Sequence, residues 1–557
     1  MNKYLFLFGI LSMMLFYSCD QLKNPVDNPE DNQISHTATI TSDEVWAKGD
    51  KPHYIGSYVI IDGATVTIEA GATVILGENA YISIRNGGGL IADGTDEVIT
   101  FTGEVKQDGY WNYIEFKESA SDAQTMLKNC IIEYGGGYGS QNSEAMVYIA
   151  NGGTFQNTIF RNSKSAAVEL TESATAVFEN NTITASYRAM IGDVTSAGYI
   201  GTGSYTGNTR DEIILNSGTI FSNTTWKKQD IPYALNSFML IDGGTVTMEP
   251  GVVLALNQDA YISVRNGGGL YAVGTATDSI YFTSLTKQAG FWSYLEVKNS
   301  ASSSNTRFEY CVFEYGGGYG APESEAMLYI NNGATLKNSI LHHTEASGLE
   351  LGSDAQPDME ANTITDCLWP ITAEFENIDY IGTGTYTGNS NDAIRVRSGT
   401  LSHSGTMLKQ DVPYHIVSWA YVDNAVLTLE AGTVINFGAD AYMSVRNSGG
   451  LLAQGTDSDS IRFTSAVEQK GYWEYLELKS SANGSLVVFD RCVFEYGGGY
   501  GSPASEAMIY LYAAGATLQN SRISNSAAWG LQYDKDVSLT ISNIEYSGNT
   551  SGDSVGK

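Results

Sequence analysis

Short runs in which apolar and polar residues alternate recur along most of the 557-residue chain. Such a period of two predicts a β-strand with one buried face, and the Gly, Asn, Asp and Ser clusters between the runs predict turns. No run has the period of an amphipathic helix, so we predict an all-β protein. In the first third of the chain the apolar triplets are about 17 residues apart on average, and they begin at Ile82, Ile99, Ile114, Ile132, Val147 and Val168.

A much longer pattern repeats three times. The segment AYISIRNGGGL at Ala80 returns, slightly changed, at Ala260 and Ala441, and EYGGGYG recurs unchanged at three positions, Glu133, Glu314 and Glu495. A repeat of about 180 residues indicates tandem units built in the same way. We place these units at residues 37–217, 218–398 and 399–549, the last one shortened and followed by a tail at 550–557.

One strand per short, irregular coil, stacked in register, is typical of a solenoid, whereas a propeller needs four strands per blade at a longer period. We therefore predict a right-handed parallel β-helix built from three tandem repeats of about 180 residues. An array of three β-sandwich domains is the alternative.

Two stretches of the first unit carry a resemblance to a known family. TVTIEAGATVI at Thr65 and GLIADGTDEVITFTG at Gly89 resemble the right-handed parallel β-helix repeat lipoproteins of the bacterial cell surface, which have a pectate-lyase-like fold. The resemblance implies the fold but no single activity, because lyases, glycosidases, phage tailspikes and adhesins share this coil. No lyase motif is matched.

The N-terminus has the pattern of an export signal. Residues 1–19 contain one Lys and an apolar run that ends at Ser18 and Cys19, and this Cys placement resembles that of a bacterial lipoprotein signal. We expect lipidation at Cys19, a polar tether at residues 20–36, and a location in the cell envelope, anchored in the outer membrane and either periplasmic or surface-exposed. An ordinary secretory signal with an incidental Cys is the alternative.

Charge narrows the range of partners. The chain has 62 acidic and 30 basic residues, a net charge of −32, and no window rich in Lys and Arg. A nucleic-acid partner needs a basic stripe that displaces counterions, so this class is excluded. The only membrane contact that we predict is the lipid anchor.

The cysteines predict a core role and no metal centre. Cys130, Cys311 and Cys492 lie 181 residues apart at equivalent places, which favours buried thiols over mutual disulfides, and Cys367 has no counterpart. Without a CxxC motif and with scattered histidines, no zinc ligand set is predicted. We assign no metal and no cofactor, and treat a bound calcium ion as a separate hypothesis.

The carboxylates form the first candidate site. If successive triplets lie directly above one another, Glu115 and Glu133 are outward neighbours, and the pKa of one of them rises unless Lys117 or Arg85 supplies a positive charge. We assign no catalytic residue, but in an enzyme these pairs would act: Glu115 with Glu133, Glu296 with Glu314, and Glu477 with Glu495.

Aromatic residues surround these carboxylates at the same places in every unit. Flat rings beside hydrogen-bonding carboxylates are what sugar binding needs. The alternative for the Trp residues is packing under a neighbouring loop. The predicted ligand-binding residues are Trp111, Tyr113, Tyr138, Glu144 and Tyr148 in the first unit, Trp292, Tyr294, Tyr319, Glu325 and Tyr329 in the second, and Trp473, Tyr475, Tyr500, Glu506 and Tyr510 in the third.

Three functional classes follow. Noncatalytic binding of a polysaccharide or cell-surface glycan is favoured, because equivalent weak sites on one rod gain avidity, whereas catalysis needs only one good site. The alternatives are a polysaccharide lyase or glycoside hydrolase, and a structural rod or adhesin.

Overall fold

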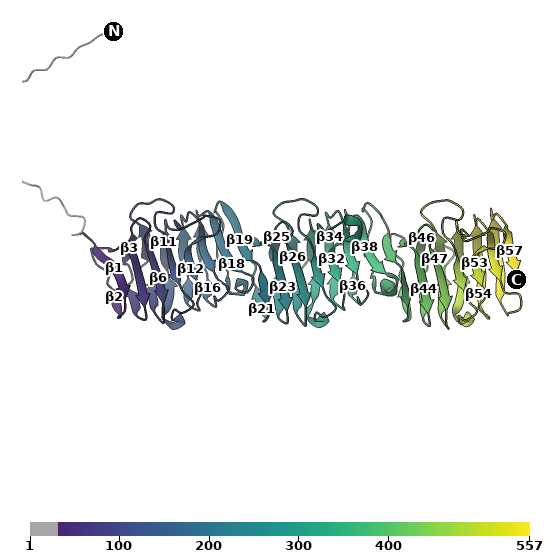
Figure 1. Ribbon diagram of the computed structural model, residues 1–557, viewed down its shortest axis with the longest axis horizontal. Coiled ribbons are helices and arrows are strands. Elements are labelled where there is room, and N and C mark those ends of the chain that lie inside the picture. The colour runs from purple at the N-terminus through teal and green to yellow at the C-terminus, as the bar shows by residue number, and fades with distance from the viewer. Residues whose placement is uncertain (1–31) are drawn as a thin grey trace, which may run out of the picture.

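The computed structural model describes residues 32–557 and shows a right-handed parallel β-helix, a long rod of stacked coils (Figure 1). Every strand pairing in this part of the chain is parallel, as in β6 with β9 and β9 with β12. The predicted fold class is therefore confirmed. The predicted signal, Cys19 and most of the tether fall outside the described residues.

Each coil contains three strands, not the single strand predicted from the triplet spacing. One coil consists of β6 (Tyr81–Arg85), β7 (Gly89–Asp93) and β8 (Ile99–Gly103), and these pair with β9 (Tyr113–Phe116), β10 (Thr125–Lys128) and β11 (Cys130–Glu133) of the next coil. We name the three sides of the rod face 1, face 2 and face 3 in that order. The prediction was wrong because all three faces bury alternate residues, so the triplets of different faces have the same period.

The remaining strands of the first unit continue these faces. The long β1 (Ile34–Ile40) and β3 (His53–Asp62) each run along face 3 and then face 1. Face 1 adds β12 (Ala145–Ile149), β15 (Ala166–Leu170) and β18 (Arg188–Asp193). Face 2 adds β2 (Glu44–Trp46), β4 (Thr65–Ile68), β13 (Thr154–Gln156) and β16 (Val177–Glu179), and face 3 adds β5 (Thr73–Leu76), β14 (Ile159–Arg161) and β17 (Thr182–Thr184).

The second unit repeats this arrangement after β19 (Arg210–Asn216). Its face 1 contains β20 (Gly218–Ile220), β23 (Phe238–Asp242), β26 (Tyr261–Arg265), β29 (Leu295–Val297), β32 (Ala326–Ile330), β35 (Ser347–Leu351) and β38 (Trp369–Glu374). Face 2 contains β21 (Thr224–Trp226), β24 (Thr245–Met248), β27 (Gly269–Val273), β30 (Arg307–Glu309), β33 (Thr335–Lys337) and β36 (Asp358–Glu360). Face 3 contains β22 (Tyr233–Leu235), β25 (Val253–Leu256), β28 (Ile280–Thr283), β31 (Cys311–Glu314), β34 (Ile340–His342), β37 (Asn362–Ile364) and β39 (Gly384–Thr385).

The third unit follows β40 (Ile394–Arg397). Its face 1 contains β41 (Gly399–Leu401), β44 (Trp419–Asp423), β47 (Tyr442–Arg446), β50 (Leu476–Leu478), β53 (Ala507–Leu511), β55 (Trp529–Tyr533) and β57 (Gly552–Gly556). Face 2 contains β42 (Gly405–Met407), β45 (Val426–Leu429), β48 (Gly450–Gln454) and β51 (Val487–Asp490), and face 3 contains β43 (Tyr414–Ile416), β46 (Val434–Phe437), β49 (Ile461–Thr464) and β52 (Cys492–Glu495). The long β54 (Thr517–Ser524) and β56 (Thr540–Ser547) continue faces 2 and 3 together.

Helix is confined to short 3-10 turns, and in the part of the chain that the structure describes no helix is long and apolar enough to cross a membrane. The turns are η2 (Asp122–Gln124), η3 (Ala197–Tyr199), η4 (Ser303–Asn305), η5 (Pro322–Ser324), η6 (Phe375–Tyr380) and η7 (Gly484–Leu486).

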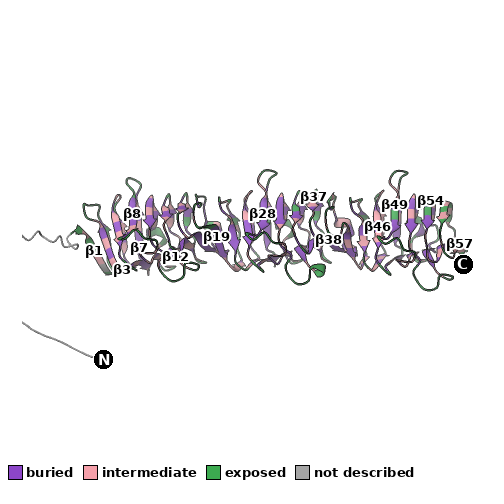
Figure 2. Ribbon diagram, turned by 90° about the horizontal axis from the view of Figure 1, so that it is seen from above, coloured by how far each residue is buried: buried purple, intermediate pink, exposed green. Residues whose placement is uncertain are grey.

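The core is the interior of the rod, where inward side chains of successive coils stack, and the exposed residues gather in the connecting loops (Figure 2). Phe282 and Phe313, for example, lie parallel with their ring centroids 4.8 Å apart. The four cysteines of the described chain are buried and free, as predicted for Cys130, Cys311 and Cys492. Burial raises the pKa of Cys130 to about 12, so this thiol is neutral and unreactive.

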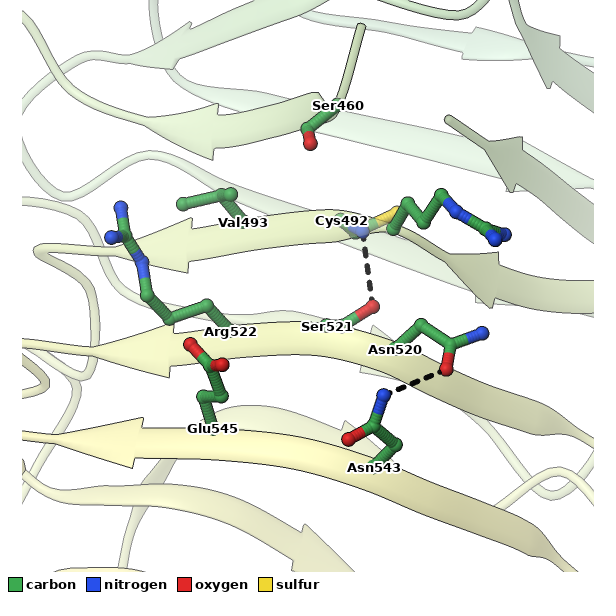
Figure 3. Close-up of a pocket in the computed structure, with 9 residues that line it drawn as sticks. Ser460, Cys492, Val493, Asn520, Ser521, Arg522, Asn543 and Glu545 are labelled. Carbon is green, nitrogen blue, oxygen red and sulfur yellow. Dashed lines mark hydrogen bonds between the residues drawn. The ribbon is translucent and has the colours of Figure 1, made fainter. Parts of the chain in front are cut away.

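Asparagines mark the corners between faces. Asn520 and Asn543 both have a positive φ, which Asn tolerates better than most residues. The Asn543 side-chain amide donates to Asn520 Oδ1 on the preceding coil at 2.9 Å, and the Cys492 amide donates to the Ser521 hydroxyl at 3.0 Å (Figure 3). These side chains satisfy polar groups at the corner between faces 2 and 3.

At each joint between units, the sheet of face 1 continues into face 3 of the next unit. β18 on face 1 of the first unit pairs with β19, which pairs with β22 on face 3 of the second unit, and β40 links the second unit to the third in the same way. The hydrogen-bonded sheet therefore crosses both joints without a break. Equivalent strands of the three units, such as β6, β26 and β47, nevertheless lie along the same side of the rod (Figure 1).

Candidate functional site

The register on face 1 separates the predicted carboxylate pairs. Glu115 on β9 lies between Ser83 on β6 and Tyr148 on β12, whereas Glu133 lies on face 3. The prediction that they are outward neighbours is wrong, because consecutive strands of the sequence belong to different faces. The same separation applies to Glu296 and Glu314 and to Glu477 and Glu495.

The face 3 member of each pair is held by cations and a threonine. Glu133 accepts hydrogen bonds from Thr102 at 2.9 Å and from Arg161 Nε at 2.7 Å, and its side chain is only 5% exposed. Glu495 is paired with Arg462 in the same manner. Removal of one partner would leave an uncompensated buried charge, so the loss of Arg161 or Arg462 would destabilise the rod.

The three tryptophans are core residues. Trp111, Trp292 and Trp473 are all 0% exposed. The indole Nε1 of Trp111 donates to the carbonyl of Glu133 at 2.9 Å, and a Cβ placed on Gly135 would lie 2.6 Å from the indole ring. The prediction that these rings are ligand platforms is therefore wrong, and packing under the GGGYG loop was the correct alternative.

Tyrosines form the exposed surface instead. In the first unit Tyr58, Tyr81 and Tyr113 stack along face 1, with centroids 5.8 and 5.2 Å apart. Tyr138 from the GGGYG loop and Tyr148 from β12 then contact Tyr113 edge to face, at 5.5 and 5.7 Å. The loop tyrosines are the most exposed members: Tyr138 is 52%, Tyr319 59% and Tyr500 49% exposed.

A tyrosine–glutamate pair closes one side of the site. The Tyr148 hydroxyl donates to Glu144 Oε2 at 2.6 Å and accepts from the amide of Ala145 at 2.9 Å. Burial and this hydrogen bond to Glu144 raise the pKa of Tyr148, so its hydroxyl stays protonated. The equivalent hydroxyl–carboxylate distances are 2.7 Å for Tyr329 with Glu325 and 2.6 Å for Tyr510 with Glu506.

A glutamate–lysine pair lies beside it. Glu115 accepts a hydrogen bond from Ser83 at 3.1 Å and pairs with Lys117 at 2.8 Å. The predicted counter-charge is thus present at Lys117, while Arg85 pairs with Asp62. The other two units reproduce the arrangement with Ser263, Glu296 and Lys298, and with Ser444, Glu477 and Lys479.

In the second unit these groups line an open cavity of about 280 Å³. It brings together the predicted Tyr294, Tyr319, Glu325 and Tyr329 with Glu296 and Lys298. Ser324, which also lines the cavity, was missed, although it opens the SEAM motif that recurs in every unit. The cavity can present ring faces, carboxylate acceptors and an ammonium donor to one small polar ligand.

The three units differ at the next coil beyond this site. Glu169 follows Tyr148 on face 1, and its counterparts are Glu350 and Gln532. Arg397 binds both oxygens of Glu350, at 2.6 and 3.0 Å. Burial, together with Asp193 and Glu144, raises the pKa of Glu169 to about 7. In the sequence, the only signal at this position is the change from Glu in the first two units to Gln532 in the third.

Another hollow, of about 280 Å³, lies on face 3 of the third unit (Figure 3). Asn520 and Asn543 form part of its wall together with Arg491, Arg522 and Glu545. It contains no aromatic side chain, so it lacks the composition expected for sugar binding.

Comparison with known proteins supports the fold. Residues 218–334 match the family model described as a pectate-lyase like beta helix domain. The matched segment contains the cavity residues of the second unit from Tyr294 to Tyr329. No curated protein matches the chain. The fold is thus that of a parallel β-helix protein of the pectate-lyase-like type.

Proposed function

We propose that this chain is an exported, lipid-anchored β-helix protein that binds carbohydrate without catalysis through three repeated sites on face 1. One observation carries the proposal: the group formed by Tyr113, Tyr138, Tyr148, Glu144 and the Glu115–Lys117 pair recurs in all three units with the same contacts. A purely structural ladder does not need half-exposed tyrosines at the tips of three loops.

The chemistry of the site fits a neutral sugar. The exposed ring of Tyr138 offers a surface for the CH groups of a pyranose, and Glu144 and Glu115 offer acceptors for hydroxyl groups. Each site contains two carboxylates and one ammonium group, and the whole chain carries a net charge of −32. A polyanionic glycan is therefore repelled over long range.

The arrangement of the sites favours a polymer. The strands that carry them lie along one side of the rod (Figure 1), so that one extended chain can meet all three. Linked weak sites raise the overall affinity by roughly 10²–10⁴ without new contacts.

The test is affinity electrophoresis of the chain from Asp20 in gels that contain neutral or acidic polysaccharides. Retardation by a neutral glycan is expected to fall slightly in the single variants Y138A, Y319A and Y500A, and to disappear in the triple variant. Y271A is the matched control, since Tyr271 is an exposed tyrosine on face 2. Retardation by no glycan, or equal retardation of the triple variant, would contradict the proposal.

Hydrolysis is the second candidate, and Glu169 is the observation that favours it. A carboxyl whose pKa is about 7, one coil beyond a tyrosine site, has the protonation state that a general acid needs. Reducing ends released by the wild type but not by E169Q would move the assignment to a glycoside hydrolase with one active unit. An unsaturated product that absorbs in the ultraviolet would indicate a lyase instead.

The anchor is tested separately at Cys19. Metabolic labelling with a palmitate analogue in a bacterial host should label the wild-type chain, and C19S should remain unlabelled. Labelling of C19S would contradict lipidation at this residue and would leave the glycan proposal untouched.

A further inference from the structure

We infer that face 3 of the second unit contains a binding site for a divalent transition metal, formed by Glu314, His342 and His343. One ligand atom from each of these three side chains lies within 4.8 Å of the other two. The site is separate from the proposed sugar site, which lies on face 1.

The parallel register of β31 and β34 places the first two ligands together. Glu314 pairs with His342 across the strands, and His342 Nε2 lies 3.3 Å from Glu314 Oε2. A tetrahedral zinc ion with bonds of about 2.0–2.1 Å holds its ligand atoms roughly 3.4 Å apart. The distance between these two ligand atoms already suits such an ion.

The corner after β34 brings in the third ligand. Consecutive residues of a strand point to opposite sides, but His343 has φ of 56° and leaves the strand, so that its ring lies 4.2 Å from the ring of His342. His343 also stacks on Tyr315 at 5.2 Å. Two histidines that are adjacent in sequence therefore serve the same site.

One nitrogen of His343 has no partner in the described structure. Its Nδ1 is buried without a hydrogen bond, while its Nε2 lies 3.4 Å from Asp366 Oδ2. A carboxylate on the far nitrogen is the common second partner of a metal-bound imidazole, which it orients. Buried polar atoms without partners are rare, and a bound ion would satisfy this one.

The other units show that this arrangement is a departure from the repeat. Where the second unit has His342 and His343, the first has Arg161 and Asn162, and the arginine neutralises Glu133. In the third unit Ser524 and Asn525 occupy these places, and Arg462 and Arg522 pair with Glu495. Only in the second unit, among these three described sites, do imidazoles replace the guanidinium group.

Lys287 pairs with only one of the two carboxylate oxygens of Glu314. Its Nζ lies 3.0 Å from Glu314 Oε1, so the other oxygen of the carboxylate, Oε2, faces His342. The Thr283 hydroxyl donates to the same oxygen, Oε1, at 2.6 Å, so Oε2 is the oxygen that a metal ion can reach.

Two imidazoles and a carboxylate favour Zn²⁺, with the fourth position open to water. The experiment is isothermal titration of the chelator-treated chain from Asp20 with Zn²⁺, followed by the visible spectrum of the Co²⁺ form. One tightly bound Zn²⁺ per chain and a tetrahedral Co²⁺ spectrum are expected. D366N should weaken binding by about 10–100-fold.

The matched variant is H342R/H343N, which gives the second unit the residues that the first unit has. It should lose the tight Zn²⁺ and the Zn²⁺-dependent rise in melting temperature, while its melting temperature without metal stays near that of the wild type. H403N is the control, because His403 pairs with Asp379 outside the cluster, and it should bind Zn²⁺ like the wild type. No tight Zn²⁺ in the wild type, or unchanged binding in H342R/H343N, would overturn the inference.

Discussion

The surroundings of Glu169 on face 1 are peculiar to the first unit, because its counterpart Glu350 is paired with Arg397 and the third unit has Gln532 at this place. The folded state raises its pKa to about 7, whereas in the unfolded chain it titrates near its ordinary value. Its protonated form is therefore favoured by the fold, and the stability that it contributes is complete below about pH 4 and is lost as the pH rises through 7.

We expect E169Q to remove this loss of stability at neutral pH. Between pH 4 and pH 8 the wild type should lose about 2–3 kcal/mol relative to the variant, measured as the difference between their urea unfolding curves. The third unit has Gln532 at the same place, so the fold accommodates the substituted side chain. Parallel pH profiles for the two proteins would show that Glu169 is not held neutral.

Two aromatic residues of the second unit allow stability and glycan binding to be tested separately. W292A removes a fully buried ring and should lower the stability by about 3–5 kcal/mol, because the cavity cannot collapse. Y319A removes a ring that is 59% exposed and should leave the melting temperature nearly unchanged while weakening glycan binding. Thermal melts together with affinity electrophoresis check both, and a stable W292A that fails to bind glycan would reverse the assignment.

At the scale of elements, the sequence predicted the strands and the units better than their stacking. Period-two triplets such as the one at Ile82 are indeed strands, and EYGGGYG does mark a loop over the site. The order in which strands stack was not predictable, because strands of different faces can have the same buried pattern, as β9 on face 1 and β5 on face 3 do. For this reason the sequence predicted Glu115 and Glu133 to be neighbours, whereas in the structure Tyr148 is the neighbour of Glu115 and Glu133 lies on face 3.

The burial of Trp111 could not be predicted from the sequence either. Trp111 and Tyr138 both lie near the repeated loop, and both residue types are common in sugar sites and in cores. Trp111 is buried because Gly135 approaches its indole ring closely, and this contact depends on the path of the folded loop.

The GGGYG loop itself supports a prediction. A Cβ on Gly318 would lie 2.0 Å from the carbonyl oxygen of Gly290, a backbone atom that cannot move aside easily. G318A should therefore displace the loop with Tyr319 and weaken binding at the second site. G49A is the control, since no atom lies within 4 Å of the added methyl group. Normal glycan binding by G318A, measured in a chain with Y138A and Y500A, would show that the loop position is unimportant.

For the whole molecule, the equivalent joints predict that a unit can be removed. Deletion of residues 218–398 would join the first unit to the third through the same sheet pairing that β19 makes in the native chain. The shortened protein should fold, and its maximum dimension in small-angle X-ray scattering should fall by about one third. Its glycan retardation should drop because one linked site is lost.

Deletion of residues 218–388 is the matched control. It leaves ten extra residues at the joint, and these include β40, so that β19 and β40 would both compete for the pairing with β43. This chain should aggregate or melt at a much lower temperature. Equal stability of the two deletion variants would mean that the joint tolerates extra residues between the units.

Because the hydrogen-bonded sheet runs across both joints, the described part of the rod has no hinge at which one unit could swing against the next. The three tyrosine clusters are therefore held at constant intervals. A polymer whose own repeat matches that interval can occupy all three clusters at once. A polymer with a different repeat must bend or leave one cluster unoccupied. The protein would then select its ligand by length and periodicity as well as by the sugar at each position.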